Sequence, residues 1–418
     1  MSSESPVPAP PRRRDHPLTR SWAGMIGLGT IAIILALCFG SIPWAFGSPS
    51  GEAMVSRYES GQPRQSIIPP IWAPKDAIDL RRIVDASTPE KLAEVVATVA
   101  RDTGTPAAQV AVTRDPAVLR MLVDRLGDAA PTFLLGSDQL GRSLFTRLLA
   151  GGTISLSVGV AAAFISVMIG TLYGALAGYA GGRLDALMMR IVDVLYGLPY
   201  ILLVVLIAVA SDGVIDRWQR HTIEQRAAQR SAWVELQLAG QADAGPERRL
   251  QLDNEAMARF GTGELSGPQR TRIDVVALLV AIGGVSWLTM ARVIRGQVLS
   301  LKAQPFVESA RAIGAPVHWI FWRHLLPNLL GPIIVYATLT VPQAILQESF
   351  LSFLGIGIKP PLPSWGNLAA DGLSELNRHR SHWWLLLFPC LLLGVTLLAL
   401  NFVGEGLREA FDPRRKRE

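Results

Sequence analysis

The chain has 418 residues, of which 50% are hydrophobic and 18% charged, and its net charge is +6. Its mean hydropathy of +0.30 is too high for an ordinary soluble protein and too low for a chain that lies wholly in a membrane. Cys38 and Cys390 are its two cysteines and both lie in apolar runs, which excludes a disulfide framework and a cysteine metal site. We therefore expect an all-α polytopic membrane protein with large segments outside the bilayer.

Six stretches contain no Asp, Glu, Lys or Arg. Each is close to or longer than the ~20 residues that a helix needs to cross a ~30 Å hydrocarbon core. These stretches are 21–51, 148–182, 194–211, 275–291, 325–347 and 383–404. A seventh run, 349–358, is too short to span and is followed by glycines and prolines, so it predicts an interfacial or re-entrant segment. The first run is longer than the apolar core of a typical signal peptide, which favours an uncleaved anchor over a cleaved signal.

The distribution of Arg and Lys sets the orientation of the spans. The segments placed inside are 1–20, 183–193, 292–324 and 405–418, and they hold 16 Arg and Lys in 78 residues. The short outside loop 348–382 holds only 3 in 35 residues. Six transmembrane helices with both termini cytoplasmic is the consistent topology. Because this topology accounts for the basic charge, no nucleic acid is expected as a partner.

The segments between the spans complete the expected organisation. In chain order it is a cytoplasmic tail 1–20, a first span 21–47, an external helical segment 48–147, spans two and three in 148–211, an external helical insertion 212–274, spans four to six in 275–404 with the cytoplasmic loop 292–324, and a tail 405–418. Cap and proline signals predict helices that begin near Pro89 and Pro116. The insertion predicts a helical hairpin with breaks near 240–246 and 261–267. Both external segments fit either a spacer or a contact for an external partner.

Several functional motifs are missing. No Gly-Lys dipeptide occurs, so the chain has no P-loop for ATP, and it contains no HExxH or GxSxG motif of a hydrolase. We therefore expect no enzyme, no catalytic residue and no metal site. The charge-free runs contain no ionisable residue, which argues against an ion-coupled transporter. Helix breakers such as Gly197, Pro199, Pro332 and Pro342 fit either a polar passage or ordinary kinked helices.

The loop 292–324 predicts two short helices joined by a turn. Residues 304–313 form the first, with Glu308 near its start, Gly314 fits its C-cap, and Pro316 begins the next helical piece. The apolar face of such a short helix needs cover. It lies either on the membrane surface or in the groove of another protein.

This loop resembles the EAA loop of bacterial ABC importer permeases. Residues 308–314 match the Glu-Ala-Ala-x-x-x-Gly pattern, with Ser309 in place of alanine, and residues 324–328 follow nine positions later with the Leu-Pro ending. The matching positions outside the short helix are His324, Pro327 and Asn328. His324 is typical of the peptide-importer branch of that family.

Further ordered motifs resemble the same branch, the C-type permeases of dipeptide, oligopeptide and nickel ABC importers. The stretch 136–143 resembles the entry to the second span, with Ser137 and Ser143 in place of Thr and Asp. The positions that carry the motifs are Gly136, Asp138, Gly141, Arg142, Asp193, Arg292, Leu354, Gly355, Trp365 and Gly366, followed by the tail 401–413. The resemblance covers 136–211 and 275–413 together with the first span.

The resemblance implies a type I ABC importer permease in the bacterial inner membrane. It implies a second permease subunit, two cytoplasmic ATP-binding subunits and an external substrate-binding protein as partners, with ATP and Mg bound by the ATP-binding subunits and no cofactor on this chain. It also implies a coupling helix that contacts an ATPase groove. The contact residues implied are Glu308, Ser309, Ala310, Ala312, Gly314 and Pro316.

The substrate stays open among dipeptides, longer peptides, nickel complexes and peptide-like antibiotics. Two other functions also stay open at this point. One is an export permease of the same architecture, and the other is a channel or structural subunit that never meets an ATPase.

Overall fold

A computed structural model describes residues 22–48, 55–239, 245–376 and 380–411, and within these ranges the only strand-like pairs are isolated β-bridges. The helices are α1 (Trp22–Gly40), α2 (Ile42–Ala45), α3 (Ala77–Ala86), α4 (Pro89–Thr103), α5 (Ala107–Val112), α6 (Pro116–Leu126), α7 (Leu144–Ala180), α8 (Gly182–Tyr196), α9 (Tyr200–Leu238), α10 (Pro246–Phe260), α11 (Gly267–Lys302), α12 (Pro305–Ala312), α13 (Val317–Ile320), α14 (Leu326–Phe353), α15 (Trp365–Ser374) and α16 (Trp384–Phe411). Short 3-10 turns, η2 (Pro63–Gln65) and η3 (Gly127–Ala129), and a π-helical turn, η4 (Phe321–Leu325), join them. The predicted tail 1–20 and residues 412–418, with Asp412 and Pro413, lie outside the described residues.

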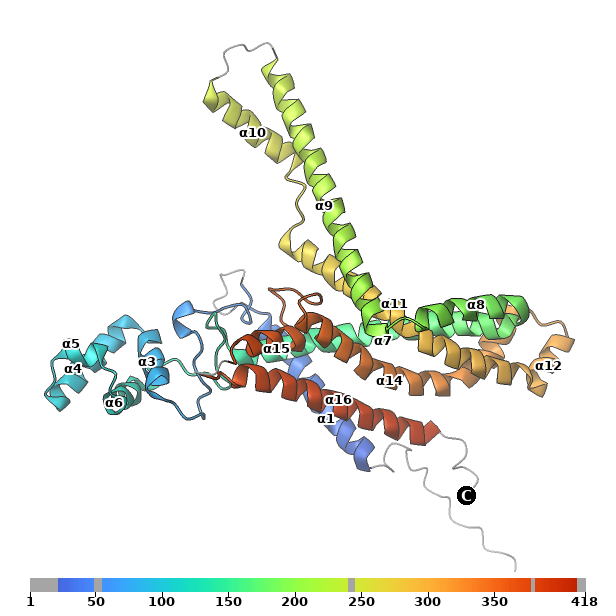
Figure 1. Cartoon of the computed structure of the whole chain (residues 1–418), viewed down its shortest axis with the longest axis horizontal. Helices are drawn as coiled ribbons and strands as arrows, with labels where there is room; N and C mark the ends of the chain where they lie inside the picture. The colour runs from blue at the N-terminus through green and yellow to red at the C-terminus, as the bar shows by residue number, and fades with distance from the viewer. Residues whose placement is uncertain (1–21, 49–54, 240–244, 377–379, 412–418) are drawn as a thin grey trace, which may run out of the picture.

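The helices α1, α7, α11, α14 and α16 run side by side as a bundle (Figure 1). Among the described residues, five helical segments built on these helices are long and apolar enough to cross a membrane. The helices α8 and α9 form a sixth candidate if they count as one bent span. The helix α12 lies at one end of the bundle, and α15 and the group α3–α6 lie toward the other. We call these the α12 end and the α15 end.

The two longest bundle helices, α7 and α11, approach each other through glycines spaced four residues apart. A Cβ atom on Gly174 would lie 2.3 Å from the carbonyl oxygen of Ala291, and one on Gly170 would lie 2.5 Å from the Cβ of Met290. Small residues at this spacing bring helix backbones together in a bilayer, where apolar burial alone drives no association. The pair therefore forms the central contact of the bundle.

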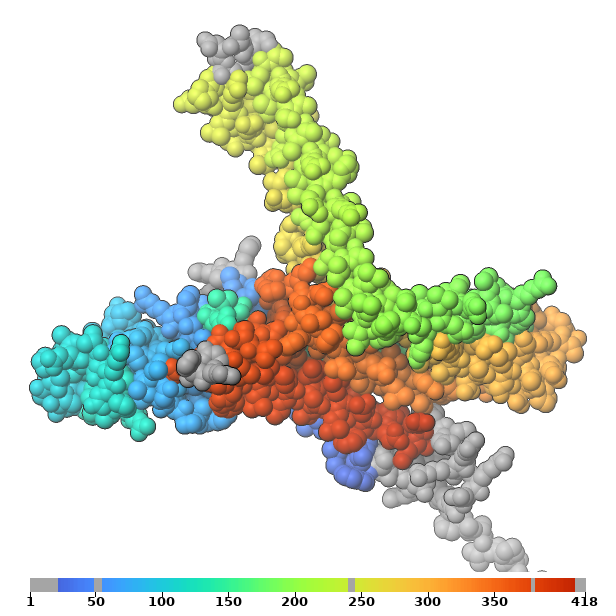
Figure 2. All heavy atoms as spheres, in the orientation of Figure 1, coloured from blue at the N-terminus to red at the C-terminus, as the bar shows by residue number. Residues whose placement is uncertain are grey.

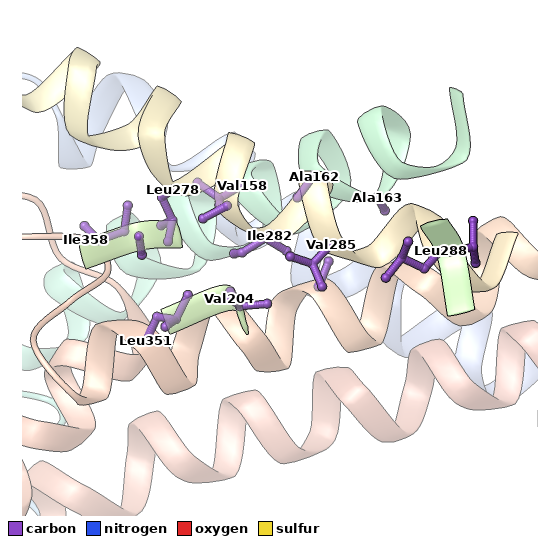
Figure 3. Close-up of a cluster of buried hydrophobic side chains, with 14 residues drawn as sticks. Val158, Ala162, Ala163, Val204, Leu278, Ile282, Val285, Leu288, Leu351 and Ile358 are labelled. Atoms are coloured by element: carbon purple, nitrogen blue, oxygen red, sulfur yellow. The ribbon is translucent and has the colours of Figure 1, made fainter. Parts of the chain in front are cut away.

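A buried apolar cluster joins five helices, α7, α8, α9, α11 and α14, beside this contact (Figure 3). Ala162 of α7, Val204 of α9, Ile282 of α11 and Leu351 of α14 are at most 2% exposed. On α9 the buried residues are Val204 and Ala208, both near its start. The rest of α9 and α10 therefore stand away from the bundle as an arm (Figures 1 and 2).

The run 194–211, predicted as the third span with the breakers Gly197 and Pro199, is not one continuous helix. The chain breaks between Tyr196 and Tyr200, and α8 and α9 meet at 89°. Pro199 is the N-cap of α9; it lacks an N–H and disfavours helical geometry at the residue before it, so a helix cannot continue through this point. The stretch predicted as the inside loop 183–193 is also helical, as part of α8.

The predicted seventh run, 349–358, is not a separate segment. The helix α14 continues through Phe353, and a left-handed Gly355 (φ 77°) ends the turn that follows. Pro332 and Pro342 lie inside α14 without ending it. These prolines therefore fit the alternative of ordinary helices with local irregularities, whereas Pro199 marks a true break.

The segment before the second span forms a small helical unit of α3, α4, α5 and α6 with its own buried core. The predicted starts at Pro89 and Pro116 are confirmed, and Val96, Leu119 and Leu122 lie in that core. The helices α3 and α5 were not predicted. In the arm, α9 ends at Leu238, α10 begins at Pro246 and α11 begins at Gly267, which confirms the predicted helical hairpin and its breaks.

Candidate functional site

The short helix α12 ends in a turn that requires glycine. The N–H of Gly314 donates to the carbonyl of Arg311 (2.9 Å) and the N–H of Ala315 donates to the carbonyl of Ala310 (3.0 Å). This pair of bonds is a Schellman cap, in which the residue after the helix adopts a left-handed conformation. Gly314 has a φ of 78°, and nothing lies within 4 Å of the position of its missing Cβ. Backbone conformation, and not space, is therefore the reason for glycine here.

One face of α12 is already covered by the chain itself. Val307 and Ala310 are buried against Ile294 and Val298 of α11 and against Leu325. The apolar side chains on this face of α12 are therefore covered within the chain, without a partner or a membrane. Ala310 does not belong to the exposed part of the predicted contact surface, because the Ala310 side chain is only 5% exposed.

The opposite face of α12 is open. Glu308, Ser309, Ala312, Gly314 and Pro316 are all exposed there or directly after it. Ile313 projects beside them with 81% of its surface exposed. Within the described part of the chain, Glu308 forms no salt bridge. The face thus combines one acidic side chain with one prominent apolar side chain.

Tyr179 of α7 contacts both α12 and the end of α11. The guanidinium of Arg311 lies 4.9 Å from the centre of the Tyr179 ring, a cation–π arrangement. The ammonium of Lys302, at the end of α11, donates to the carbonyl of Tyr179 (3.0 Å). The open face is therefore carried by a rigid corner of the bundle.

The second part of the predicted motif connects α12 to α14. The ring of His324 packs between Phe306 (5.8 Å between centres) and Trp319 (5.0 Å). The side-chain amide of Asn328 donates to the carbonyl of His324 (2.7 Å). Pro327 lies in the first turn of α14, directly after the π-helical turn η4. From Val317 to Phe353 the chain is thus one continuous helical rod that begins beside α12.

Ion pairs join α8 to α11 near the same end. Arg295 makes two hydrogen bonds to Asp185 (2.5 and 2.7 Å). Arg292 pairs with Asp193 (2.9 Å) and stacks over the ring of Tyr196 (4.0 Å). The predicted motif residues Asp193 and Arg292 therefore meet each other, although they are far apart in the sequence.

At the α15 end, Asp138 organises the predicted entry to the second span. Its Oδ1 accepts from the N–H groups of Leu140 and Arg142 (both 2.9 Å), and its Oδ2 accepts from the side chains of Arg142 and Arg147 (both 2.7 Å). Gly136 and Gly141 have φ values of 88° and 71°, which permit this tight turn. The motif is therefore a structural clamp built around a buried carboxylate.

The two residues of the stretch 136–143 that depart from the family pattern have local roles. The hydroxyl of Ser137 accepts from the N–H of Ile68 (2.8 Å) and donates to the carbonyl of Gln65 (2.6 Å). Ser143 is the N-cap of α7. Serine thus serves as a hydrogen-bonding or capping residue at both positions.

Trp365 and Gly366 hold α15 against the bundle. The Trp365 side chain is fully buried, and its indole N–H donates to the carbonyl of Leu148 on α7 (3.1 Å). A Cβ on Gly366 would lie 2.0 Å from the carbonyl oxygen of Ser349 on α14. By contrast, Leu354 is 48% exposed, and Gly355 serves the turn after α14. These four predicted motif residues therefore do not form one site.

Two buried charged residues of the bundle helices, Arg147 and Glu348, are not predicted from the sequence. Arg147 completes the Asp138 cluster, and Glu348 is 0% exposed inside α14. The charge-free run 325–347 stops one residue before Glu348, so α14 carries an acid although that run contains none. Nothing in the local sequence signals the partner of Arg147, but the position of Glu348 at the end of an apolar run was a usable signal.

A cavity of about 620 Å³ opens between α8, α9, α11 and α14. Its polar lining residues are Tyr196, Tyr200, Thr289, Gln343 and Gln347, and its other lining residues are apolar. The Tyr200 hydroxyl is 2.6 Å from that of Ser286. No charged side chain lines it within the described ranges. In those ranges there is also no group of three or more His, Cys, Asp or Glu residues that could hold a metal ion.

Comparison with known proteins gives the family. A family model described as the binding-protein-dependent transport system inner membrane component matches residues 170–417. The chain is 40% identical over 282 residues to the dipeptide transport system permease protein DppC of Bacillus subtilis, covering 68% of this chain and 69% of that protein. It is 40% identical over 279 residues to the oligopeptide transport system permease protein OppC of Escherichia coli, covering 67% and 72%. The chain therefore belongs to the family of inner-membrane components of binding-protein-dependent transport systems.

Proposed function

We propose that this chain is the permease subunit of an ATP-driven importer for peptides. The names of its relatives, which are dipeptide and oligopeptide permeases, support the substrate class. The observation that carries the coupling function is the open face of α12, mounted rigidly beside the first turn of the long rod 317–353.

The proposed topology has six spans, with α8 and α9 together as the third, and with both termini in the cytoplasm. The α12 end then faces the cytoplasm. The segments 48–147 and 212–274 lie outside. The concentration of Arg and Lys in the segments assigned to the inside supports this orientation.

The proposed partners are a second permease subunit, two cytoplasmic ATP-binding subunits and an external substrate-binding protein. ATP and Mg bind to the ATP-binding subunits, and this chain holds no cofactor and catalyses no reaction. Glu308, Ser309, Ala312, Gly314 and Pro316 contact a groove of one ATP-binding subunit, with Ile313 as the apolar anchor.

In this mechanism, closure of the ATP-binding subunits displaces α12. Because α12 packs on α11 and Leu325, the displacement passes into the rod that contains α14. The uncharged cavity forms this chain's wall of the translocation path. Amide and hydroxyl groups such as those of Gln343, Gln347 and Tyr200 donate and accept hydrogen bonds, as a peptide main chain requires.

The test replaces Gly314 with leucine in the complex reconstituted in vesicles. A left-handed φ strains any side chain with a Cβ, so we expect normal insertion, continued ATP hydrolysis and loss of uptake of a labelled peptide bound by the cognate binding protein. Gly296→Ala is the control, because nothing lies within 4 Å of its Cβ position and its φ is not left-handed. Normal uptake by Gly314→Leu contradicts the proposed coupling, and a chain that purifies without an ATP-binding subunit supports a channel subunit instead.

A further inference from the structure

Glu348 is a fully buried carboxylate that the proposed mechanism does not yet use. It lies in the last third of α14, about 33 Å along the helix from Leu326 at 1.5 Å per residue. The hydroxyls of Ser349 (3.2 Å) and Ser352 (2.8 Å) donate to its two oxygens. Among the described residues it forms no salt bridge with a cationic side chain. A buried carboxylate of this kind is costly unless hydrogen-bond donors surround it.

The donors around Glu348 come from three helices. The hydroxyls of Ser155 on α7 and of Ser364, the N-cap of α15, also face its carboxylate, and both serines are fully buried. The oxygen of Ser155 accepts from the N–H of Trp365 (3.2 Å), and that of Ser364 accepts from the N–H of Asn367 (3.2 Å). Since these backbone groups already donate to the serine oxygens, the serine protons are free to point at the carboxylate.

This arrangement joins a helix N-terminus to an acid through serine hydroxyls. The first N–H groups of α15 carry the positive end of its dipole. The hydroxyls of Ser155 and Ser364 accept hydrogen bonds from these N–H groups and face Glu348 on their other side. The backbone of Gly366 also touches that of Ser349, since a Cβ on Gly366 would lie 2.0 Å from the Ser349 carbonyl oxygen. The start of α15 is thus held to α14 by packing and by a buried acceptor.

We propose that Glu348 is a positioning residue for transport, which fastens α15 to α14 so that a movement of α14 from the α12 end carries α15 with it at the opposite end. This inference rests on the proposed function. It adds a second, distal contact to the coupling path. It also explains why an acid occupies an otherwise apolar span without any ion to carry.

The test follows α15 directly, with cysteine labelling in the reconstituted complex. Cys390, which is exposed, is replaced by serine, and Leu373 of α15, which is 49% exposed, is replaced by cysteine as the reporter. The labelling rate with an impermeant maleimide is measured with and without ATP and vanadate. We expect at least about a threefold change in the parent protein.

Glu348→Gln replaces one of the two acceptor oxygens with an NH2 group that faces donating serine hydroxyls, whereas Glu348→Asp keeps both carboxylate oxygens. We expect the Glu348→Gln protein to hydrolyse ATP while losing the labelling change and most uptake of labelled dialanine per ATP, with partial recovery in Glu348→Asp. Thr396→Val is the matched control, because Thr396 is fully buried and, among the described residues, its hydroxyl bonds within α16 (to the Leu392 carbonyl, 2.7 Å).

The outcomes separate the two proposals. If Glu348→Gln shows the same labelling change and uptake per ATP as Thr396→Val, the positioning role is overturned. If the parent complex neither hydrolyses ATP nor responds to it, the proposed function fails instead. Should Glu348→Gln not assemble, Ser155→Ala removes a single relay hydroxyl from α7, and the same labelling measurement on that variant decides the question.

Discussion

The two ends of the bundle differ in whether their polar groups are buried or exposed. At the α15 end, Asp138, Arg147 and Glu348 are buried and surrounded by donors or acceptors from several helices. At the α12 end, Glu308 and Ile313 point outward from a short helix whose other face is packed. Buried polar networks specify one arrangement of their helices, whereas an open face on a rigid corner suits a partner. The comparison therefore separates a fastened end from a docking end.

The largest effect on stability is expected for Asp138→Ala at the fastened end. It leaves the 3%-exposed Arg147 without its close partner, and breaking a buried ion pair in this way costs about 3–5 kcal/mol. We expect a strongly lowered melting temperature in detergent and little protein in the membrane. Asp85→Ala, which breaks an exposed pair with Arg81, is the control and should cost at most about 1 kcal/mol. Equal melting temperatures for the two variants would show that Asp138 does not fasten this end.

A second, smaller effect is expected for Gly366→Ala. The added methyl group would lie 2.0 Å from the Ser349 carbonyl oxygen, and because this oxygen belongs to the backbone, α14 or α15 must shift. Overpacking of this kind costs about 1–3 kcal/mol. The same substitution at Gly284, where nothing lies within 4 Å, should be neutral or slightly stabilising. Thermal unfolding of the two variants side by side measures the difference, and a Gly366→Ala protein as stable as the Gly284 variant refutes the close contact.

The sequence predicted the docking end better than the fastened end. Gly314 and the helix before it could be placed because a C-cap depends on neighbouring residues alone. The clamp of Asp138 with Arg147 and the pairs between α8 and α11 depend on how helices pack, which no local pattern encodes. Glu348 was missed because a rule based on charge-free runs ends each span at the first acid, even where other helices supply its donors.

The same distinction applies to the rest of the fold. Pro89 and Pro116 predicted the starts of their helices because proline favours the first turn. The start of α3 was not predicted, although a capping box between Asp76 and Asp79 marks it. Gly197 and Pro199 were recognised as breakers, but the 89° angle depends on the packing of α9 against α11 and could not be read from them.

A third prediction concerns pH and the α3–α6 unit. Burial raises the pKa of Asp76, but the backbone N–H of Asp79 and the charge of Arg380 outweigh it, so the pKa lies below its ordinary value of 3.8. The unfolded chain then binds the proton more tightly, so this group stabilises the fold above that ordinary value and the contribution is lost as pH falls. Burial raises the pKa of Asp79, which acts in the opposite direction.

The measurement compares Asp76→Asn with the parent in melts between about pH 6 and about pH 3. We expect the parent to lose slightly more stability on acidification than Asp76→Asn, because the variant has no proton to bind there. The effect is small because the Asp76 side chain is 59% exposed and well screened. An acid dependence that is steeper in Asp76→Asn than in the parent would contradict the assigned direction.

The smallest effect on stability, and the sharpest test of the docking end, is expected for Ile313→Ser. Its side chain is 81% exposed, so the free energy of unfolding should change by no more than about 0.5 kcal/mol. If Ile313 anchors an ATP-binding subunit, the loss of about 1–2 kcal/mol of contact energy lowers the affinity for that subunit roughly tenfold. Val112→Ser is the matched control, since Val112 is a 71%-exposed apolar residue on α5 at the other end. Titration of the purified ATP-binding subunit against both variants in vesicles should weaken only for Ile313→Ser, and equal weakening for both would mean that exposed apolar side chains at the two ends are equivalent and that α12 has no special place in docking.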